Sequence, residues 1–171
     1  MAIPTQSNII LTGFMGTGKT TVGELLAQRL QRPFIDTDAL IVERDGRSIA
    51  EIFAEDGEAA FRAWERAVAL ELAQQQGLVI ATGGRLMLDE DNAEALAASG
   101  QVFCLTAVPT TILARVQDDS KRPLLNVPNP AQRIALLLEM RREGYGRFPQ
   151  IATDGKTAEQ VVDEILLVAG G

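Results

Sequence analysis

Short apolar runs alternate along the chain with longer segments in which apolar residues recur every three or four positions. The short runs are typical of buried strands, and the longer segments are typical of helices that bury one face. The strands that this pattern predicts cover 8–12, 33–36, 78–81, 101–105 and 148–152. The predicted helices cover 21–30, 39–44, 48–53, a segment from 56 or 57 to 76, 89–99, 109–115, 131–143 and a last segment that begins at 156 or 157.

Strands that alternate with helices predict parallel βαβ units. We therefore expect an α/β fold with three layers, α/β/α, around a parallel sheet of about five strands. A chain of 171 residues without internal repeats predicts one domain, 1–171. The segment 117–130 contains three prolines and breaks the pattern, so we expect a mobile loop there.

A glycine-rich turn, Gly13-Phe14-Met15-Gly16-Thr17-Gly18-Lys19-Thr20, joins the first strand to the first helix. It fits the spacing G-x-x-x-x-G-K-[ST] of a phosphate-binding loop, and its context makes a plain βα turn the weaker interpretation. Backbone N–H groups and the helix N-terminus would hold anionic oxygens, Lys19 would reach the β- and γ-phosphates, and the Thr20 hydroxyl would bind Mg²⁺. The residues expected to contact ATP here are Gly13, Met15, Gly16, Thr17, Gly18, Lys19, Thr20 and Thr21.

Two carboxylates, Asp36 and Asp38, follow the second strand. Ligands of open parallel sheets bind at the carboxyl ends of the strands, so both should lie near the phosphate-binding loop. One could serve Mg²⁺ directly or through water, and the other could accept a hydrogen bond from a substrate hydroxyl. The alternative is that Asp38 only caps the helix that begins at residue 39.

Several arginines are ambiguous by themselves. Arg62 and Glu65 are three positions apart on one helix, which predicts a surface ion pair, and Arg141 with Tyr145 is equally ambiguous. Arg122 lies in the proline-rich loop, where a cation could swing over the nucleotide and stabilise the transferring phosphate. The alternative is a solvated basic residue that balances nearby acidic side chains.

Composition excludes several classes of protein. The net charge is −7 and there is no histidine, which argues against a nucleic-acid-binding protein and removes histidine-based catalysis. The single cysteine, Cys104, lies in an apolar run and is interpreted as an inert core residue. No apolar run approaches the ~20 residues of a membrane span, and no secretory signal is seen, so we expect a cytoplasmic protein.

From residue 8 to residue 168 the chain resembles the shikimate kinases. No single later motif is decisive, but their order and spacing together are specific. The motifs that carry the resemblance are Gly13-Phe14-Met15-Gly16-Thr17-Gly18-Lys19-Thr20, Phe34-Ile35-Asp36-Thr37-Asp38, Phe61-Arg62 with Glu65, Thr82-Gly83-Gly84, Arg122-Pro123-Leu124-Leu125, and Arg141 with Tyr145.

The resemblance implies a small P-loop kinase of the nucleoside-monophosphate-kinase type, with a mobile lid at about 117–130. It would move the γ-phosphate of ATP to the 3-hydroxyl of shikimate, a step of aromatic amino-acid biosynthesis. On the nucleotide side, Lys19 would hold the phosphates, Thr20 would bind Mg²⁺, and Asp36 would support the ion through water. Arg122 would come from the closing lid, and Arg115 matches the arginine that the family places against adenine.

On the acceptor side, the resemblance implies that Asp38 contacts the shikimate hydroxyls and can take the proton of the acceptor. Arg62 and Arg141 would grip the shikimate carboxylate. The turn at Gly83 and Gly84 would lie against the acceptor, with the Gly84 N–H bonded to a ring hydroxyl. ATP, Mg²⁺ and a small anionic hydroxy acid are thus the expected ligands of a monomer.

The chain departs from the family pattern at Arg85, where a third glycine is usual. This arginine could crowd the acceptor pocket, add a grip on an anion, or point to solvent or to an acidic neighbour. The sequence from Tyr145 to Ala152 also differs, and Ala158 replaces a common proline near the adenine. Arg85 leaves open a kinase of the same fold for a gluconate-like acid. A second alternative is a nucleotide-binding regulator without turnover, against which the intact Lys19, Asp36, Asp38 and Arg122 speak.

Overall fold

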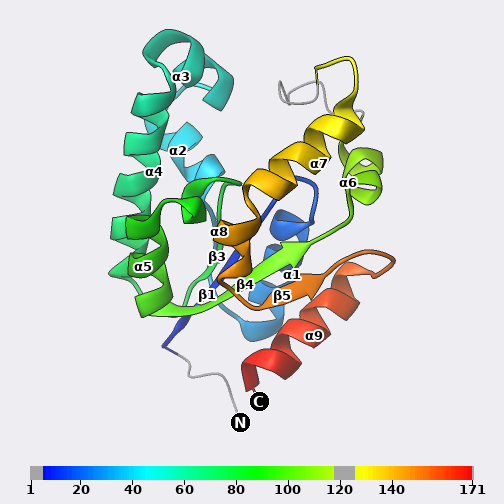
Figure 1. Ribbon diagram of the computed structural model, residues 1–171. Coiled ribbons are helices and arrows are strands. Elements are labelled where there is room, and N and C mark those ends of the chain that lie inside the picture. Colours follow the sequence, from blue (N-terminus) through cyan, green and yellow to red (C-terminus); the bar gives the residue numbers. More distant parts are fainter. Residues whose placement is uncertain (1–5, 118–125, 171) are drawn as a thin grey trace.

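Five parallel strands form the sheet at the centre of the molecule (Figure 1). The computed structural model describes residues 6–117 and 126–170. The strands lie in the order β2-β3-β1-β4-β5. Their bounds are β1 Asn8–Gly13, β2 Phe34–Asp36, β3 Val79–Ala81, β4 Gly100–Thr106 and β5 Gln150–Ala152. The predicted parallel sheet is therefore confirmed, with β1 central between β3 and β4.

Helices cover both faces of this sheet (Figure 1). The helices are α1 Lys19–Leu30, α2 Thr37–Asp45, α3 Ile49–Asp56, α4 Glu58–Ala73, α5 Glu90–Ser99, α6 Pro109–Val116, α7 Pro130–Met140, α8 Arg142–Gly146 and α9 Ala158–Gly170, with a 3₁₀ turn η1 at Leu86–Leu88. The sheet and its two helical layers make the predicted α/β/α arrangement. None of the described helices has both the length and the apolar character that a bilayer crossing requires.

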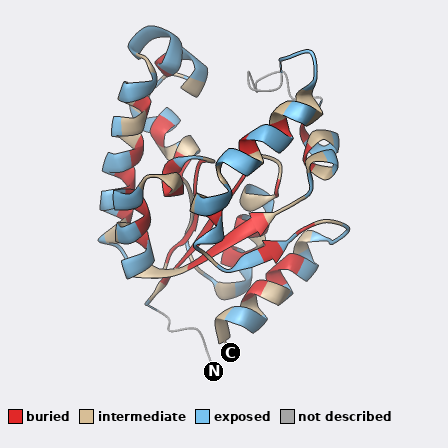
Figure 2. Ribbon diagram, in the orientation of Figure 1, coloured by how far each residue is buried: buried red, intermediate tan, exposed pale blue. Residues whose placement is uncertain are grey.

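Alternation along β1 assigns its side chains to two different cores. Ile10 packs with α4 and α5 residues, among them Val68 and Leu96. Ile9 and Leu11, on the opposite face, pack with α1 and α9 residues. The inner strands β1 and β3 and most of β4 are accordingly buried, as the red ribbon in Figure 2 shows, whereas the edge strands β2 and β5 are partly exposed.

A third core lies where the phosphate-binding loop meets α6 and α7. Phe14 and Cys104 are buried here together with Ile112 and Ile134. Cys104 is 1% exposed, and burial raises the pKa of its thiol to about 11. The interpretation of Cys104 as an inert core residue is confirmed.

The helix predicted over 131–143 is wrong in its C-terminal part. It ends at Met140, Arg141 departs from helical geometry (φ −99°, ψ 1°), and α8 then runs through Gly146. Gly144 lies inside α8, where a Cβ would come within 2.5 Å of Leu88 Cδ2. Close packing against η1 thus decides what the local sequence does not.

The expected lid lies between α6 and α7. The structure places Gln117 directly after α6 and begins α7 at Pro130, so no described residue between them is helical. Arg122 and its neighbours lie outside the described residues.

Candidate active site

The glycine-rich loop curls because two of its glycines adopt left-handed backbone angles, φ +76° at Gly16 and φ +95° at Gly18. At Gly16, a Cβ would also come within 2.7 Å of Val116 Cγ1 on α6. The buried Thr17 hydroxyl donates to Phe14 O at 2.8 Å and closes the loop from inside. Gly18 is the N-cap of α1, which begins at Lys19 rather than at the expected residue 21.

Lys19 folds back over this loop. Its Nζ donates to Gly13 O at 2.7 Å and to Phe14 O at 2.9 Å, so the ammonium group lies at the mouth of the loop. Met15 is half-buried, and Thr20 and Thr21 are exposed on the first turn of α1. The predicted ATP-contacting residues from Gly13 to Thr21 are thus brought together around one turn of chain.

Asp36 connects this loop to the next strand. Its Oδ2 accepts from the Thr20 hydroxyl at 2.9 Å, and its Oδ1 accepts from the Ala39 N–H at 3.1 Å. Asp36 is therefore the N-cap of α2, which begins at Thr37. The alternative that Asp38 caps this helix is wrong, because Asp36 occupies the N-cap and Asp38 lies inside the first turn.

The Thr20 hydroxyl and the Asp36 carboxylate form a pair of oxygen donors suited to a hard cation. Among the described residues, no group of three or more His, Cys, Asp or Glu side chains could hold a metal ion. Mg²⁺ takes few protein ligands and keeps waters and phosphate oxygens instead. The donor set beside the loop therefore fits Mg²⁺ carried with a nucleotide.

Asp38 lies against the turn that follows β3. A Cβ built on Gly83 would come within 2.5 Å of Asp38 Oδ1, which shows how closely the carboxylate approaches this backbone. The Gly83 N–H donates to Thr37 Oγ1 at 2.9 Å, and this bond joins the start of α2 to the turn. Because the Gly83 N–H is bound to Thr37, the role of Gly83 at this site is to leave room for the Asp38 carboxylate.

The next residue, Gly84, meets the C-terminal part of the chain. Tyr145 OH donates to Gly84 O, and Arg141 Nη1 would lie 3.7 Å from a Gly84 Cβ. Arg141 also stacks over the ring of Phe14 at 5.2 Å from the ring centroid. Among the described residues, the Gly84 N–H has no hydrogen-bond acceptor, unlike that of Gly83.

Arg62 projects from α4 and is fixed by its neighbours. It forms an ion pair with Glu65 and lies over the rings of Phe61 and Phe53, at 5.4 and 5.9 Å. The predicted ion pair is confirmed, but it is no surface pair, because Glu65 is only 2% exposed. Burial raises the pKa of the Glu65 carboxyl, Arg62 opposes this shift, and the negative charge of Asp38 adds to it. Arg62, Glu65 and Asp38 therefore belong to one electrostatic neighbourhood.

Arg115 is bonded at the edge of the loop. Its guanidinium donates to Gly16 O at 3.0 Å, to Thr153 Oγ1 at 3.0 Å and to Thr153 O at 3.1 Å. These bonds tie α6 to the phosphate-binding loop and to the chain after β5. Arg115 thus stands beside the loop, and its contact with the nucleotide stays a prediction.

Two contacts of this site were missed by sequence reasoning. Thr37 lies between the two aspartates and was taken only as part of the motif, although its hydroxyl fixes Gly83. Glu58 was not singled out, yet its Oε1 accepts from Arg62 at 3.3 Å and from Arg85 at 3.0 Å. The i, i+4 spacing of Glu58 and Arg62 was the available signal for one of these contacts.

The first strand of this parallel sheet runs into a phosphate-binding loop, and Asp38, Arg62 and Arg141 follow on other elements of the site. This is the arrangement of a P-loop kinase for small molecules. The comparisons with known proteins narrow this class. The shikimate kinase family model matches residues 15–169. The chain belongs to the shikimate kinase family.

Individual relatives agree with this assignment. A shikimate kinase of Geobacter sulfurreducens is 46% identical over 167 residues, which cover 96% of this chain and 92% of that protein. A solved shikimate kinase from Acinetobacter baumannii, in complex with shikimate, superposes with a TM-score of 0.91 at 39% identity, covering 96% of this chain and 93% of the other. A gluconokinase from Sinorhizobium meliloti covers 99% and 94% of the two chains with a TM-score of 0.67, but at 19% identity it shows the fold alone.

Proposed function

We propose that this protein transfers the γ-phosphoryl group of ATP to the 3-hydroxyl of shikimate and forms shikimate 3-phosphate for aromatic amino-acid biosynthesis. Family membership and the relative that binds shikimate support this function. The observation that carries it is the position of the Asp38 carboxylate against Gly83, next to Gly84, where an added Cβ would lie 3.7 Å from Arg141 Nη1. A gluconate-like acceptor is less favoured, because that likeness is limited to the fold.

The nucleotide would bind at the loop between β1 and α1. Lys19 would exchange the carbonyl oxygens of Gly13 and Phe14 for phosphate oxygens, and the loop N–H groups would hold the remaining charge. Thr20 and Asp36 would hold Mg²⁺, which supplies charge neutralisation at the β- and γ-phosphates. Arg115 would border the nucleotide, and Arg122 would supply a cation from the lid.

The acceptor would lie between α4, α8 and the turn after β3. Arg62 and Arg141 would bind its carboxylate, since guanidinium groups make planar, charge-assisted bonds to carboxylates. Asp38 would align the attacking hydroxyl and accept its proton, and the Gly84 N–H would bond a second hydroxyl. Phosphoryl transfer depends mainly on positioning and charge stabilisation, so an aspartate is adequate in this role.

The test is ADP release by the purified protein with ATP and Mg²⁺, in the presence of shikimate, quinate or gluconate. We expect turnover with shikimate and little with the other two acids. The variant Asp38→Asn should lose most of kcat while its affinity for ATP stays within about twofold. Turnover with gluconate alone would replace the proposed acceptor, and full activity of Asp38→Asn would remove the proposed role of this carboxylate.

The proposal extends to the setting of the enzyme. Residues 1–171 would act as one domain and as a monomer in the cytoplasm, with ATP and shikimate as small-molecule ligands. The net charge of −7 supports the absence of nucleic-acid binding, which needs a basic surface. Size-exclusion chromatography coupled to light scattering measures the state of assembly directly.

A further inference from the structure

Arg85 occupies the position where the family pattern has a glycine, and its backbone does not require one. Its φ of −109° is available to any residue. The exchange from glycine therefore costs little in backbone strain and adds a guanidinium group next to Gly84.

Glu58 holds Arg85 close to Arg62. Glu58 Oε1 accepts from Arg85 Nη1 at 3.0 Å and from Arg62 Nη2 at 3.3 Å. Two guanidinium groups, one from α4 and one from the turn after β3, thus share a single oxygen atom. Glu65 forms the second ion pair of Arg62, so Arg62 keeps a carboxylate if Glu58 moves.

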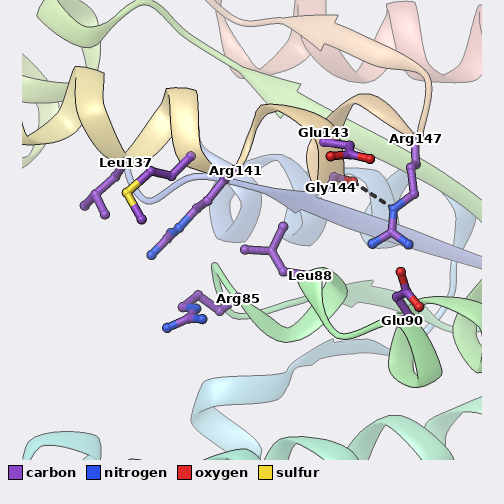
Figure 3. A pocket seen from close by; sticks show the side chains of 9 residues that line it. Arg85, Leu88, Glu90, Leu137, Arg141, Glu143, Gly144 and Arg147 are labelled. Atoms are coloured by element: carbon purple, nitrogen blue, oxygen red, sulfur yellow. Dashed lines mark hydrogen bonds between the residues drawn. The ribbon is translucent and has the colours of Figure 1, made fainter.

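Arg85 also borders a cavity of about 460 Å³ together with Arg141, Leu88 and Leu137. In Figure 3 the guanidinium groups of Arg85 and Arg141 extend toward the same side, away from Leu88. With the described residues, Arg141 forms no ion pair; its contacts are the Phe14 ring and Tyr145 OH. Arg85 is therefore linked through Glu58 to Arg62 and shares a cavity with Arg141, the two arginines that the proposed function assigns to the carboxylate of the acceptor.

The bond between Arg85 and Glu58 is weak enough to be exchanged. The side chains of Arg85 and Glu58 are 50% and 55% exposed. Exposed ion pairs contribute little because both groups are well solvated and screened by salt. A ligand carboxylate bound by Arg62 and Arg141 can therefore replace the Glu58 carboxylate as the partner of Arg85, at little cost in free energy.

We propose that Arg85 is a specificity-determining residue of the acceptor site, a third guanidinium that leaves Glu58 and binds the carboxylate of the acceptor. This inference rests on the proposed function and deepens it. No covalent step is involved, since Arg85 adds binding energy that is the same before and during phosphoryl transfer. Its contribution should therefore appear in KM and leave kcat unchanged.

The experiment compares an anionic and a neutral form of one acceptor. Initial rates of ADP release are measured with shikimate and with shikimate methyl ester, for the wild type, Arg85→Leu, Arg85→Lys and Glu58→Gln. We expect Arg85→Leu to raise KM for shikimate about tenfold, the size of one charge-assisted hydrogen bond, with kcat within twofold. KM for the ester should stay unchanged in this variant, and Arg85→Lys should recover part of the affinity for the acid.

Glu58→Gln is the matched control, because it removes the same ion pair and keeps Arg85. If Arg85 binds the acceptor, Glu58→Gln retains the preference for the acid over the ester. Equal rises of KM in Glu58→Gln and Arg85→Leu would overturn the inference, because Arg85 would then act only through Glu58. An unchanged KM in Arg85→Leu, or equal changes for acid and ester, would also overturn it.

This outcome is separable from the proposed function. If the wild type turns over neither shikimate nor its ester, the acceptor assignment itself has failed. If the wild type prefers shikimate and Arg85→Leu does so equally, only the role of Arg85 is wrong. Thermal unfolding midpoints of all four proteins verify that the comparison is made between folded enzymes.

Discussion

The variant Gly83→Ala tests the position of the Asp38 carboxylate, the proposed base of the phosphoryl transfer, with one added methyl group. The new Cβ would lie 2.5 Å from Asp38 Oδ1, 3.2 Å from Cγ and 3.3 Å from Oδ2. Gly83 is not among the glycines with positive φ, so alanine fits the backbone. The collision is therefore with the end of a side chain that can move, and the fold can keep its shape.

The size of the effect follows from the distance. An ordinary contact needs at least 3.4 Å, so the carboxylate must retreat by about 0.9 Å. A misplacement of about 1 Å in a catalytic group can cost about 100-fold in rate, or about 2.7 kcal/mol. We expect kcat to fall about 100-fold, while the free energy of unfolding changes by less than about 1 kcal/mol because Asp38 can rotate away.

The assay is the rate of ADP release at saturating ATP and shikimate, together with unfolding in urea. Gly146→Ala is the matched control: it makes the same chemical change in α8, where a Cβ would meet nothing within 4 Å. We expect the control to keep kcat within about twofold. A Gly83→Ala enzyme with wild-type kcat and wild-type stability would refute the reasoning, because the observed position of Asp38 would then not matter for turnover.

Three further predictions concern single side chains. Lys19→Ala should abolish phosphoryl transfer with the fold intact by circular dichroism; wild-type turnover would contradict the assignment of the loop. The Cys104 thiol, whose pKa burial raises to about 11, should react with iodoacetamide at pH 8 far more slowly in the native protein than in urea; equal rates would mean that the third core is open. Burial raises the pKa of Glu65, so the folded state keeps this proton to a higher pH than the unfolded chain does. The unfolding free energy of the wild type, measured in urea, should therefore fall relative to that of Glu65→Gln as pH rises above the usual glutamate pKa of about 4.3. If the unfolding free energies of the two proteins change with pH in parallel, the raised pKa of Glu65 is contradicted.

Much of the architecture was predictable because it depends on neighbours in the chain. The alternation of apolar runs with helical periods gave the five strands and their parallel arrangement. Ser48 and Glu51, three positions apart, form a capping box at the start of α3, with bonds of 3.1 and 2.7 Å between each side chain and the backbone of the other. The loop motif predicted its own setting, since strand, turn and helix are contiguous in sequence.

The boundaries and contacts that failed depend on distant residues. The sequence places two candidate caps, Asp36 and Asp38, at the start of α2, and the alternative considered there named Asp38. The choice depends on distant residues, because Asp36 binds the Thr20 hydroxyl and Asp38 lies against Gly83. The need for glycine at position 144 depends in the same way on a distant residue, because a Cβ there would come within 2.5 Å of Leu88 Cδ2.

By itself, then, the sequence determined the fold class, the phosphate-binding loop and the types of residue at the proposed acceptor site. These follow from the local spacing of apolar residues and from short motifs. Only the tertiary structure decided that Asp36 caps α2, that Asp38 lies against Gly83, and that Arg85 shares Glu58 with Arg62. Arg85 and Glu58 are 27 positions apart. No local pattern relates two side chains at that separation; the packing of α4 beside the turn after β3 brings them together.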